Sequence, residues 1–353
     1  MYQIAEQLLS LSNEAAIYVR HSKIAFANTA AELILGRDCV GRSVRAALGP
    51  DAAGPQTSSF IADVPIGGRR YAVRVSPVGD GQAFFFTQTD IEPPMLNDEL
   101  IGAMRSVLMS INLSCSVGRT RAEQLGDEEL SRCFMGTTRA YYMLSRILAN
   151  ISMLEGLYSD TFPFQATAVD LTELCLGIVD SISDVFSGIE VRTNFPQEAV
   201  ICGDRALLQQ AVLNLLSNCF CHASGLSNVS MSLLNCSDRV VLSVTDDGCG
   251  IEHAVMNSVF GKASDTGEPL RISHGASTGL KLVRAVARKH CGSVIIESRP
   301  EFGTIVRLSL AKGILPASAL CSRGQPYSLP RSALYTGLAD CLPEDFFKPA
   351  FQD

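Results

Sequence analysis

The stretch from Asp204 to Ile251 constrains the fold of this chain more than any other part of its sequence. It opens with DRALLQQAVLNLLSNCFCHAS (204–224) and closes with VVLSVTDDGCGI (240–251). Apolar residues recur at helical spacing in the first segment, and β-branched residues alternate in the second. The strand then runs into two aspartates and two glycines, which leave polar groups at a turn that a ligand can approach closely. We therefore expect a binding site between a helix and an acidic strand end.

The composition describes a globular protein. Of the 353 residues, 47% are hydrophobic and 18% are charged, so the chain has room for two or three domains with buried cores. The net charge of −7 gives no reason to expect nucleic acid as a partner. The 12 cysteines form no CxxC pair and no segment resembles a signal peptide, so reduced thiols in a cytoplasmic protein are expected. No apolar run reaches the ~18 residues of a membrane helix, and no membrane span is expected.

Residues 1–94 are expected to form a small α+β sensor domain. Short strands at 15–20 and 23–28 precede a helix at 29–36, and three strands at 58–66, 69–78 and 82–90 are separated by glycine-containing turns. This order resembles a PAS domain. Six residues are similar to the PAS helix entry: Asn28, Ala30, Ala31, Glu32, Leu35 and Gly36. His21 is interpreted as an ordinary surface histidine, and no haem or flavin is assigned.

Residues 95–160 are predicted to form a helical hairpin. A linker with two consecutive prolines, 92–94, precedes it, and Gly126-Asp127 marks the turn. Apolar residues of the second helix step by four and three alternately, as in a heptad seam. One hairpin cannot cover all of this apolar surface, whereas two hairpins can do so in a four-helix bundle. We therefore expect a homodimer through residues 97–158.

Residues 161–312 predict an α/β sandwich, in which helices cover one face of a mixed sheet. Helices are expected at 170–186, 204–220 and 278–290. Strands are expected at 164–170, 189–194, 199–202, 228–235, 239–245, 293–298 and 303–310. The tail, 313–353, contains five prolines and has helical periodicity at 334–342, but its role is not assigned. The whole chain is thus predicted to be an α+β multidomain protein.

Two asparagines on the predicted helix have the chemistry of a metal–nucleotide site. The side-chain oxygen of Asn218 is a hard, neutral ligand, as Mg²⁺ prefers, and Mg²⁺ takes its other ligands from water and phosphate. Asn214 lies one helical turn earlier and is expected to reach the same group. Cys219, Cys221 and His222 also form a conceivable metal site, but no second ligand pair at zinc spacing accompanies them.

The acidic strand end and the next helix suit the other parts of a nucleotide. The carboxylate of Asp246 can accept a hydrogen bond from an exocyclic amine such as that of adenine, and Gly248 and Gly250 leave room for the base. Ser277-Thr278-Gly279-Leu280 opens a helix whose free N–H groups form an anion site for phosphates. Thr304 begins the last strand and can hold a water molecule against the base.

The order NLLSN, DDGCGI, STGLKL and GTIVRL resembles the ATP-binding domain of sensor histidine kinases, which the gyrase, MutL and heat-shock chaperone ATPases share. The resemblance covers about residues 162–310. It implies that ATP and Mg²⁺ are bound and that residues 253–276 form a mobile lid over the nucleotide. The positions that match the family's ATP site, with Asn218 as the Mg²⁺ ligand, are Asn214, Asn218, His222, Asp246, Gly248, Gly250, Thr278, Gly279, Leu280, Lys281 and Thr304.

The departures from the family pattern bear on catalysis. Alignment of the first hairpin helix places Gly102 where the family has its phosphate-accepting histidine. The five histidines are at 21, 222, 253, 274 and 290, so the hairpin contains none. Transfer of phosphate to imidazole requires an imidazole nitrogen as nucleophile. Lys281 replaces a glycine of the phosphate loop, where its ammonium either pairs with the phosphates or faces solvent, and Cys221 replaces a basic residue for which His222 is the candidate substitute.

Three functions are compatible with these features. The first is a cytoplasmic histidine-kinase-type enzyme that transfers phosphate to another protein of a two-component phosphorelay, with a response regulator as partner. The second is a pseudokinase whose ATP occupancy sets the conformation of the dimer. The third, a gyrase- or MutL-type ATPase, is disfavoured because only about forty residues follow Leu310, too few for the second domain of those proteins.

Overall fold

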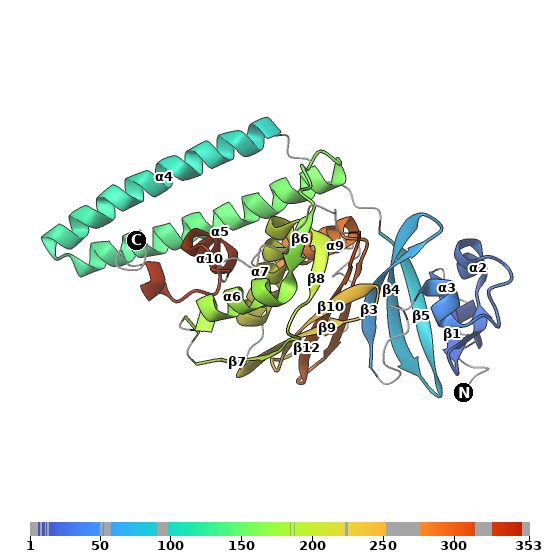
Figure 1. Cartoon of the computed structure of the whole chain (residues 1–353). Coiled ribbons are helices and arrows are strands. Elements are labelled where there is room, and N and C mark those ends of the chain that lie inside the picture. Colours follow the sequence, from blue (N-terminus) through green and yellow to red (C-terminus); the bar gives the residue numbers. More distant parts are fainter. Residues whose placement is uncertain are drawn as a thin grey trace.

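The structure is a computed structural model. It describes residues 14–49, 58–89, 98–183, 188–222, 225–251, 276–314 and 327–347, together with 185, 186, 52 and a few residues before 14. Figure 1 shows a sheet-rich N-terminal part at one end of the molecule, a second sheet with its helices in the centre, and two long helices across the other side.

The N-terminal part forms a five-stranded antiparallel sheet in the order β2-β1-β5-β4-β3. Helix α2 begins after Asn28, whose side-chain oxygen accepts a hydrogen bond from the backbone N–H of Ala31, as an N-cap residue does. The strands and α2 lie where the sequence predicts them, and α3 was not predicted. The PAS assignment stays a prediction. The elements are β1 (Ala15–Arg20), β2 (Lys23–Ala27), α2 (Thr29–Leu35), α3 (Val44–Leu48), β3 (Phe60–Ile66), β4 (Arg69–Val78) and β5 (Gly81–Gln88).

Two helices, α4 (Asp98–Leu125) and α5 (Glu128–Tyr158), form the predicted hairpin. Asp127 caps α5 by accepting a hydrogen bond from the N–H of Leu130 at 3.0 Å. Much of the apolar surface of α4 is exposed in the single chain. The exposed apolar side chains of α4 are Leu100, Met104, Val107, Met109, Ile111, Leu113, Val117 and Leu125. A single hairpin therefore leaves apolar side chains uncovered, as the heptad pattern indicates.

The central domain has the predicted α/β layers, but its strands do not all share one sheet: the predicted strands near 164–170 and 199–202 pair with each other in a separate two-stranded antiparallel sheet, β6-β8. Its sheet has the order β11-β12-β10-β9-β7, in which only β7 and β9 are parallel. In Figure 1 its helices lie on the side of the sheet that faces α5. The elements are β6 (Thr167–Asp170), α6 (Leu171–Ser183), β7 (Glu190–Asn194), β8 (Val200–Gly203), α7 (Arg205–His222), β9 (Asn228–Asn235), β10 (Arg239–Asp246), α9 (Ala276–Lys289), β11 (Ser293–Arg299) and β12 (Gly303–Ala311).

The two sheets are joined into one. Strand β3 pairs antiparallel with β11, with Ile61 opposite Ile296, so that ten strands share a single sheet. The sequence predicts both strands but not their pairing, because an edge strand presents the same row of backbone groups to any partner.

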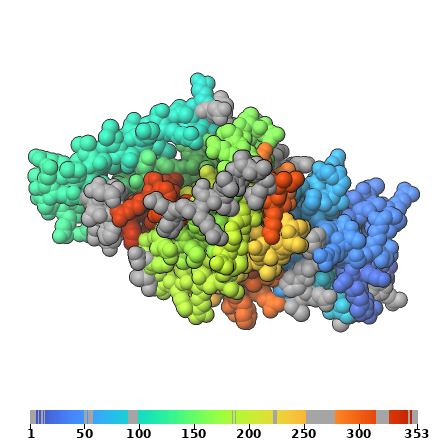
Figure 2. Space-filling model, in the orientation of Figure 1, coloured from blue at the N-terminus to red at the C-terminus, as the bar shows by residue number. Residues whose placement is uncertain are grey.

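The C-terminal tail packs against the hairpin and the central domain. Helix α10 (Arg331–Leu338) and the short 3-10 helix η2 (Glu344–Phe347) follow the described residue Tyr327. The ring of Phe347 is fully buried and lies 5.9 Å from that of Tyr142 on α5. In Figure 2 the red C-terminal residues lie between the hairpin and the central domain. The periodicity at 334–342 indicates a helix, but only the structure shows where it packs.

One expectation about membranes needs correction. The segment Glu99–Leu125 of α4 is long and apolar enough, by length and composition alone, to cross a membrane, and it is mostly exposed in this single chain. The sequence contains no uninterrupted apolar run of membrane-spanning length. The mean hydropathy of a helix can nevertheless be high when the helix includes a few charged residues. In this structure Arg105 donates to the hydroxyl of Ser152 on α5, and the buried Arg119 donates to the carbonyl of Phe347. Both arginines are thus used in contacts with the rest of the chain.

The close approach of the hairpin helices gives a stability prediction. A Cβ at Gly118 of α4 would lie 2.2 Å from the ring of Phe134 on α5. Gly118→Ala should therefore lower the free energy of unfolding by about 2 kcal/mol, as overpacking does. Gly102→Ala, in the same helix with no atom within 4 Å, should raise it by about 0.5 kcal/mol through helix propensity. Urea unfolding at one protein concentration measures both, and equal effects would contradict the packing.

Candidate functional site

Asp246 lies at the end of β10, where its carboxylate is held by backbone groups. Its Oδ1 accepts hydrogen bonds from the N–H of Gly248 at 3.1 Å and from that of Thr304 at 3.2 Å. Burial raises the pKa of this carboxyl, and the two N–H donors act in the opposite direction. Two strand ends thus position one carboxylate in a fixed orientation.

Helix α7 reaches this carboxylate through Cys219. Burial, followed by the charge of Asp246, raises the pKa of the Cys219 thiol, and the thiol donates a hydrogen bond to Asp246. The sequence did not point to Cys219 for this contact, because a cysteine on an apolar helix face usually behaves as a small hydrophobic residue. This contact links α7 to the end of β10.

The amide of Asn218 has an unmet hydrogen-bonding requirement. Its Nδ2 is buried and has no hydrogen-bond partner among the residues that the structure describes. A buried amide group without a partner costs about 1–3 kcal/mol, so such a group is typical of a site that a ligand completes. The side-chain oxygen of a neutral amide also has the chemistry of a Mg²⁺ ligand. Asn218 would supply the protein oxygen to the ion.

The glycines of the predicted site allow backbone segments to meet. Gly250 has φ +69° and Gly303 has φ +91°, which side chains rarely adopt. A Cβ at Gly250 would lie 2.1 Å from the carbonyl oxygen of Arg299, and one at Gly303 would lie 2.0 Å from that of Asp246. These two glycines are therefore required by the packing of the β11–β12 turn against the end of β10. The hydroxyl of Thr304 is 2.9 Å from that of Ser298.

Helix α9 brings its first turn close to α7. Gly279 is buried, and a Cβ there would lie 2.8 Å from Oδ1 of Asn214. Thr278 and Leu280 are half-buried and Lys281 is exposed. The predicted lid lies outside the described residues except for Ala276, which begins α9. His222 ends α7, and its side chain also lies outside the described part.

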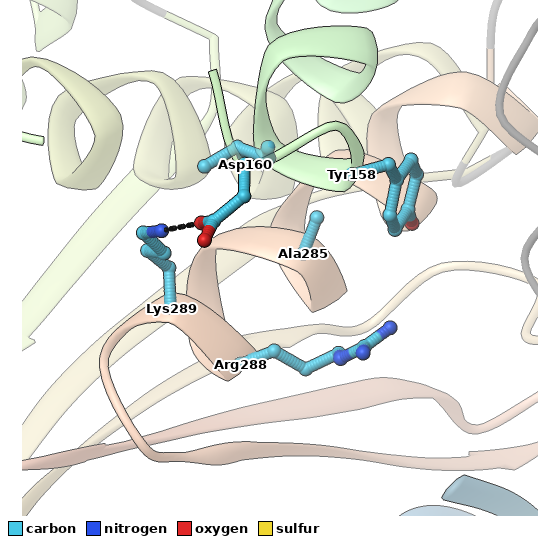
Figure 3. A pocket seen from close by; sticks show the side chains of 6 residues that line it. Tyr158, Asp160, Ala285, Arg288 and Lys289 are labelled. Atoms are coloured by element: carbon cyan, nitrogen blue, oxygen red, sulfur yellow. Dashed lines mark hydrogen bonds and ion pairs between the residues drawn. The ribbon is translucent and has the colours of Figure 1, made fainter. Parts of the chain in front are cut away.

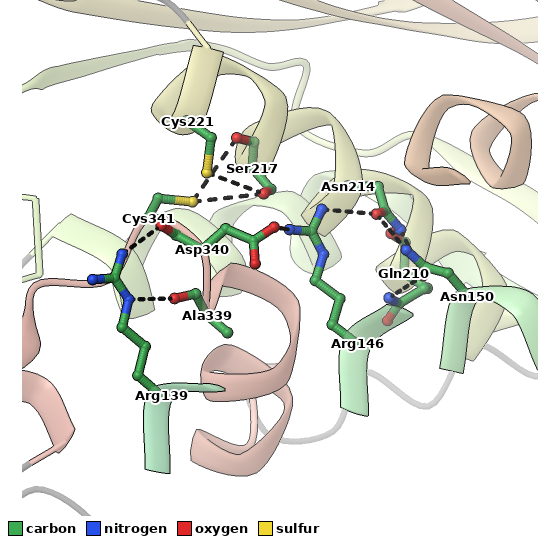
Figure 4. Close-up of polar contacts among 10 residues, drawn as sticks. All are labelled: Arg139, Arg146, Asn150, Gln210, Asn214, Ser217, Cys221, Ala339, Asp340 and Cys341. Atoms are coloured by element: carbon green, nitrogen blue, oxygen red, sulfur yellow. Dashed lines mark hydrogen bonds and ion pairs between the residues drawn. The ribbon is translucent and has the colours of Figure 1, made fainter. Parts of the chain in front are cut away.

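Asn214 is bound to α5. Its Oδ1 accepts hydrogen bonds from Arg146 and from Asn150, both at 3.1 Å, and its Nδ2 donates to the carbonyl of Gln210 at 2.9 Å. Figure 4 shows these side chains meeting between α5 and α7. The amide of Asn214 is thus engaged with the hairpin, whereas the Nδ2 of Asn218, one turn later, has no partner among the described residues. The prediction that both amides reach the nucleotide stays untested for Asn214.

The tail completes this joint. The carboxylate of Asp340 forms a buried ion pair with Arg146, whose other contact is Asn214. Arg139 donates to the carbonyls of Ala339 and of Asp340 (Figure 4). Arg146 and Asp340 are 194 positions apart in sequence, and nothing in either local pattern predicts the pair.

This joint generates a prediction. The side chains of Arg146 and Asp340 are 4% and 9% exposed, so Asp340→Asn would leave a buried guanidinium without its counter-ion. The free energy of unfolding should fall by about 3 kcal/mol. Glu190→Gln, which breaks an ion pair whose side chains are 60% or more exposed, should leave the free energy of unfolding nearly unchanged, because solvent screens exposed pairs. Chemical denaturation measures both values, and a similar small change in the two variants would refute the role of Asp340.

Comparisons with known proteins agree with this geometry. Residues 203–314 match the family model described as histidine kinase-, DNA gyrase B-, and HSP90-like ATPase. The probable sensor histidine kinase TcrY of Mycobacterium tuberculosis is 33% identical over 174 residues, which are 47% of this chain and 36% of TcrY. The sensor-like histidine kinase SenX3 of the same species is 34% identical over 124 residues, which are 35% of this chain and 30% of SenX3.

One similar solved structure is that of the histidine kinase ThkA in complex with the response regulator protein TrrA. The match covers 87% of this chain and 98% of the matched chain, with 16% sequence identity and a TM-score of 0.35. The chain spans about a third of the length of the two curated relatives. The family model lies within the central domain and the first part of the tail.

Proposed function

We propose that this chain, a protein of the histidine kinase family with an ATP-binding domain at residues 203–314, is a cytoplasmic signalling dimer that binds Mg-ATP. Asp246 would accept the adenine amine, and the first turn of α9 would face the phosphates. Mg²⁺, when bound, would neutralise phosphate charge, with Asn218 as its protein ligand. Helix α4 exposes many apolar side chains. In this proposal a second copy of the hairpin covers them, which explains why α4 is apolar enough to cross a membrane.

The observation that carries the proposal is the unsatisfied amide of Asn218. Its Nδ2 is buried and has no hydrogen-bond partner among the described residues. The next residue of α7, Cys219, is hydrogen-bonded to the buried carboxylate of Asp246, which two backbone N–H groups hold in place. A buried acidic group and a buried unsatisfied amide both reduce the stability of the protein without ligand. A ligand that presents an amine and a metal-bound phosphate chain satisfies both groups.

The hairpin contains no histidine that accepts a phosphoryl group. Gly102 stands at the acceptor position, and no histidine occurs between 98 and 158. We therefore propose that any phosphoryl transfer goes to another protein, such as a response regulator in a two-component system. Ser106, one turn from Gly102, donates its hydroxyl to the carbonyl of Gly102, as serines on helix surfaces do, and has no role in this proposal.

A pseudokinase is the second candidate, and one observation favours it. Asn218 and Asn214 are one turn apart on α7, and Asn214 is hydrogen-bonded to α5 of the hairpin. Nucleotide binding at Asn218 would therefore act on the same helix that holds the hairpin. ATP occupancy could in this way set the conformation of the dimer and the surface offered to partners, without transfer of phosphate.

Nucleotide binding tests the shared premise of both candidates. Asn218→Ala should weaken binding of ATP in magnesium at least tenfold, which is about 1.4 kcal/mol, and should have a smaller effect in EDTA, because the lost group binds the metal. Titration calorimetry measures both. Unchanged affinity in magnesium would exclude Asn218 as the ligand of the ion.

Base recognition is tested separately. Asp246→Asn replaces an acceptor-only carboxylate by an amide, so it should reduce the affinity for ATP more than the affinity for GTP. The same titration with each nucleotide gives the ratio. Equal losses for the two nucleotides would argue against the adenine contact while leaving the phosphate contacts in place.

The two candidates differ in phosphoryl transfer. We expect no acid-labile label on this chain after incubation with γ-labelled ATP and magnesium. Label that passes to a response regulator would support the enzyme, whereas ATP binding without any transfer would support the pseudokinase. Acid-labile label within residues 98–158 would contradict the assignment of Gly102.

A further inference from the structure

A cluster of charged side chains connects the N-terminal sheet to helix α9. Asp63 of β3 is fully buried and forms ion pairs with Arg284 of α9 and with Arg70 of β4, both at 2.6 Å. Arg284 also donates to the hydroxyl of Thr89, at the end of the N-terminal domain. One carboxylate thus serves two guanidinium groups at the junction of two domains.

A third arginine leaves this cluster with an excess of positive charge. Arg288 lies one turn after Arg284 on α9, and its nearest acidic group is the same Asp63 that already pairs with Arg284 and Arg70. Desolvation lowers the pKa of Arg288 most, followed by the charge of Arg70, while Tyr158 and Asp63 act in the opposite direction. With one carboxylate among three guanidinium groups, two positive charges are not compensated. Lys289, the next residue, is paired with Asp160 at 2.5 Å.

A cavity opens beside Arg288. Its volume is about 200 Å³, and it is lined by the end of α5 and the last turns of α9 (Figure 3). The lining residues are Leu157, Tyr158, Asp160, Ala285, Arg288 and Lys289. The cavity is larger than a single water molecule needs, so a small molecule can enter it.

The hydroxyl of Tyr158 lacks a partner in this cavity. It is buried and has no hydrogen bond among the described residues. Burial raises its pKa to about 12, so it is a neutral donor at physiological pH. A buried donor without an acceptor, next to uncompensated guanidinium charge, has the chemistry of an anion site that a ligand has yet to complete.

We propose that this cavity binds a small molecule through a dianionic phosphate group, with Arg288 and Tyr158 as direct donors and Lys289 at the rim. The excess of two positive charges favours a dianion over a monocarboxylate. The site is separate from the proposed ATP site, because Arg288 lies nine residues after Gly279, about 13 Å along α9 at 1.5 Å per residue. It is therefore independent of the proposed function.

A purely structural role for these charges predicts a different response. Basic residues in the last turn of α9 stabilise the negative end of the helix dipole, so that role predicts a less stable protein when Arg288 is removed. A structural role for the arginines does not explain why the hydroxyl of Tyr158 is buried without a hydrogen-bond partner among the described residues. Glu155, one turn before Tyr158, is not among the residues that line the cavity. If the cluster is a ligand site, removal of Arg288 relieves repulsion in the absence of anion and has the opposite effect.

The test uses the full chain saturated with magnesium and a non-hydrolysable ATP analogue, so that the nucleotide site is occupied. Inorganic phosphate is titrated by calorimetry at constant ionic strength, and thermal unfolding is followed in parallel. We expect phosphate to bind and to raise the unfolding midpoint. Arg288→Gln should weaken phosphate binding at least tenfold, and Tyr158→Phe several-fold. In buffer without phosphate, Arg288→Gln should raise the midpoint and Tyr158→Phe should not lower it.

The controls separate this site from other causes. Arg192→Gln removes an exposed arginine on β7 and should leave phosphate binding unchanged. Asp246→Asn should also leave it unchanged, even if that variant no longer binds ATP, so failure of the proposed nucleotide site would not be mistaken for failure here. Absence of phosphate binding, equal binding by the Arg288→Gln variant, or equal stabilisation by acetate would overturn the proposal.

Discussion

The buried hydrogen bonds between Asn214 and helix α5 are the interaction on which the arrangement of this molecule depends. A buried amide must satisfy both of its polar atoms. Asn214 accepts hydrogen bonds from Arg146 and Asn150 of the hairpin and donates to the carbonyl of Gln210 in its own helix. The guanidinium of Arg146 in turn requires a carboxylate, which Asp340 of the tail provides. Hairpin, central domain and tail therefore meet at one polar joint, and loss of any member would leave a buried group without its partner.

Helix α7 connects this joint to the candidate nucleotide site. Cys219 of this helix donates to Asp246 at the end of β10, and Asn218 lies one turn after Asn214. A helix is stiff over one turn, so a change at one of these asparagines is transmitted to the other. In the proposed function, α7 would therefore link nucleotide occupancy to the position of the hairpin, whether or not phosphate is transferred.

Helix α9 is a second connection. Its first turn contacts Asn214 through the close approach of Gly279, and its last turns contact the N-terminal sheet through Arg284 and Asp63. The pairing of β3 with β11 holds that sheet in place. An N-terminal domain that is joined to α9 in this way is mechanically linked to the candidate site through one rigid element, and the proposed phosphate cavity lies on the same helix, beside the end of α5.

The local elements of this protein could be predicted from its sequence. Hydrophobic periodicity indicated α4, α5 and α7 to within a few residues, because the period of an amphipathic element is recorded in consecutive positions. The four motifs also predicted the ATP-binding type of the central domain, and the carboxylate of Asp246 lies at a strand end as expected. The absence of a histidine from the hairpin is likewise a property of the sequence alone.

Only the tertiary structure decided which of these elements meet. The pairing of β3 with β11, the contact of Cys219 with Asp246 and the ion pair between Arg146 and Asp340 join residues that are far apart in sequence. Local patterns show that a side chain is apolar or charged, but they do not identify its partner, since every buried polar group must find one and many candidates are chemically equivalent. The sequence therefore determined the elements and their chemistry, and packing determined the joint, the glycine contacts and the charged cavity.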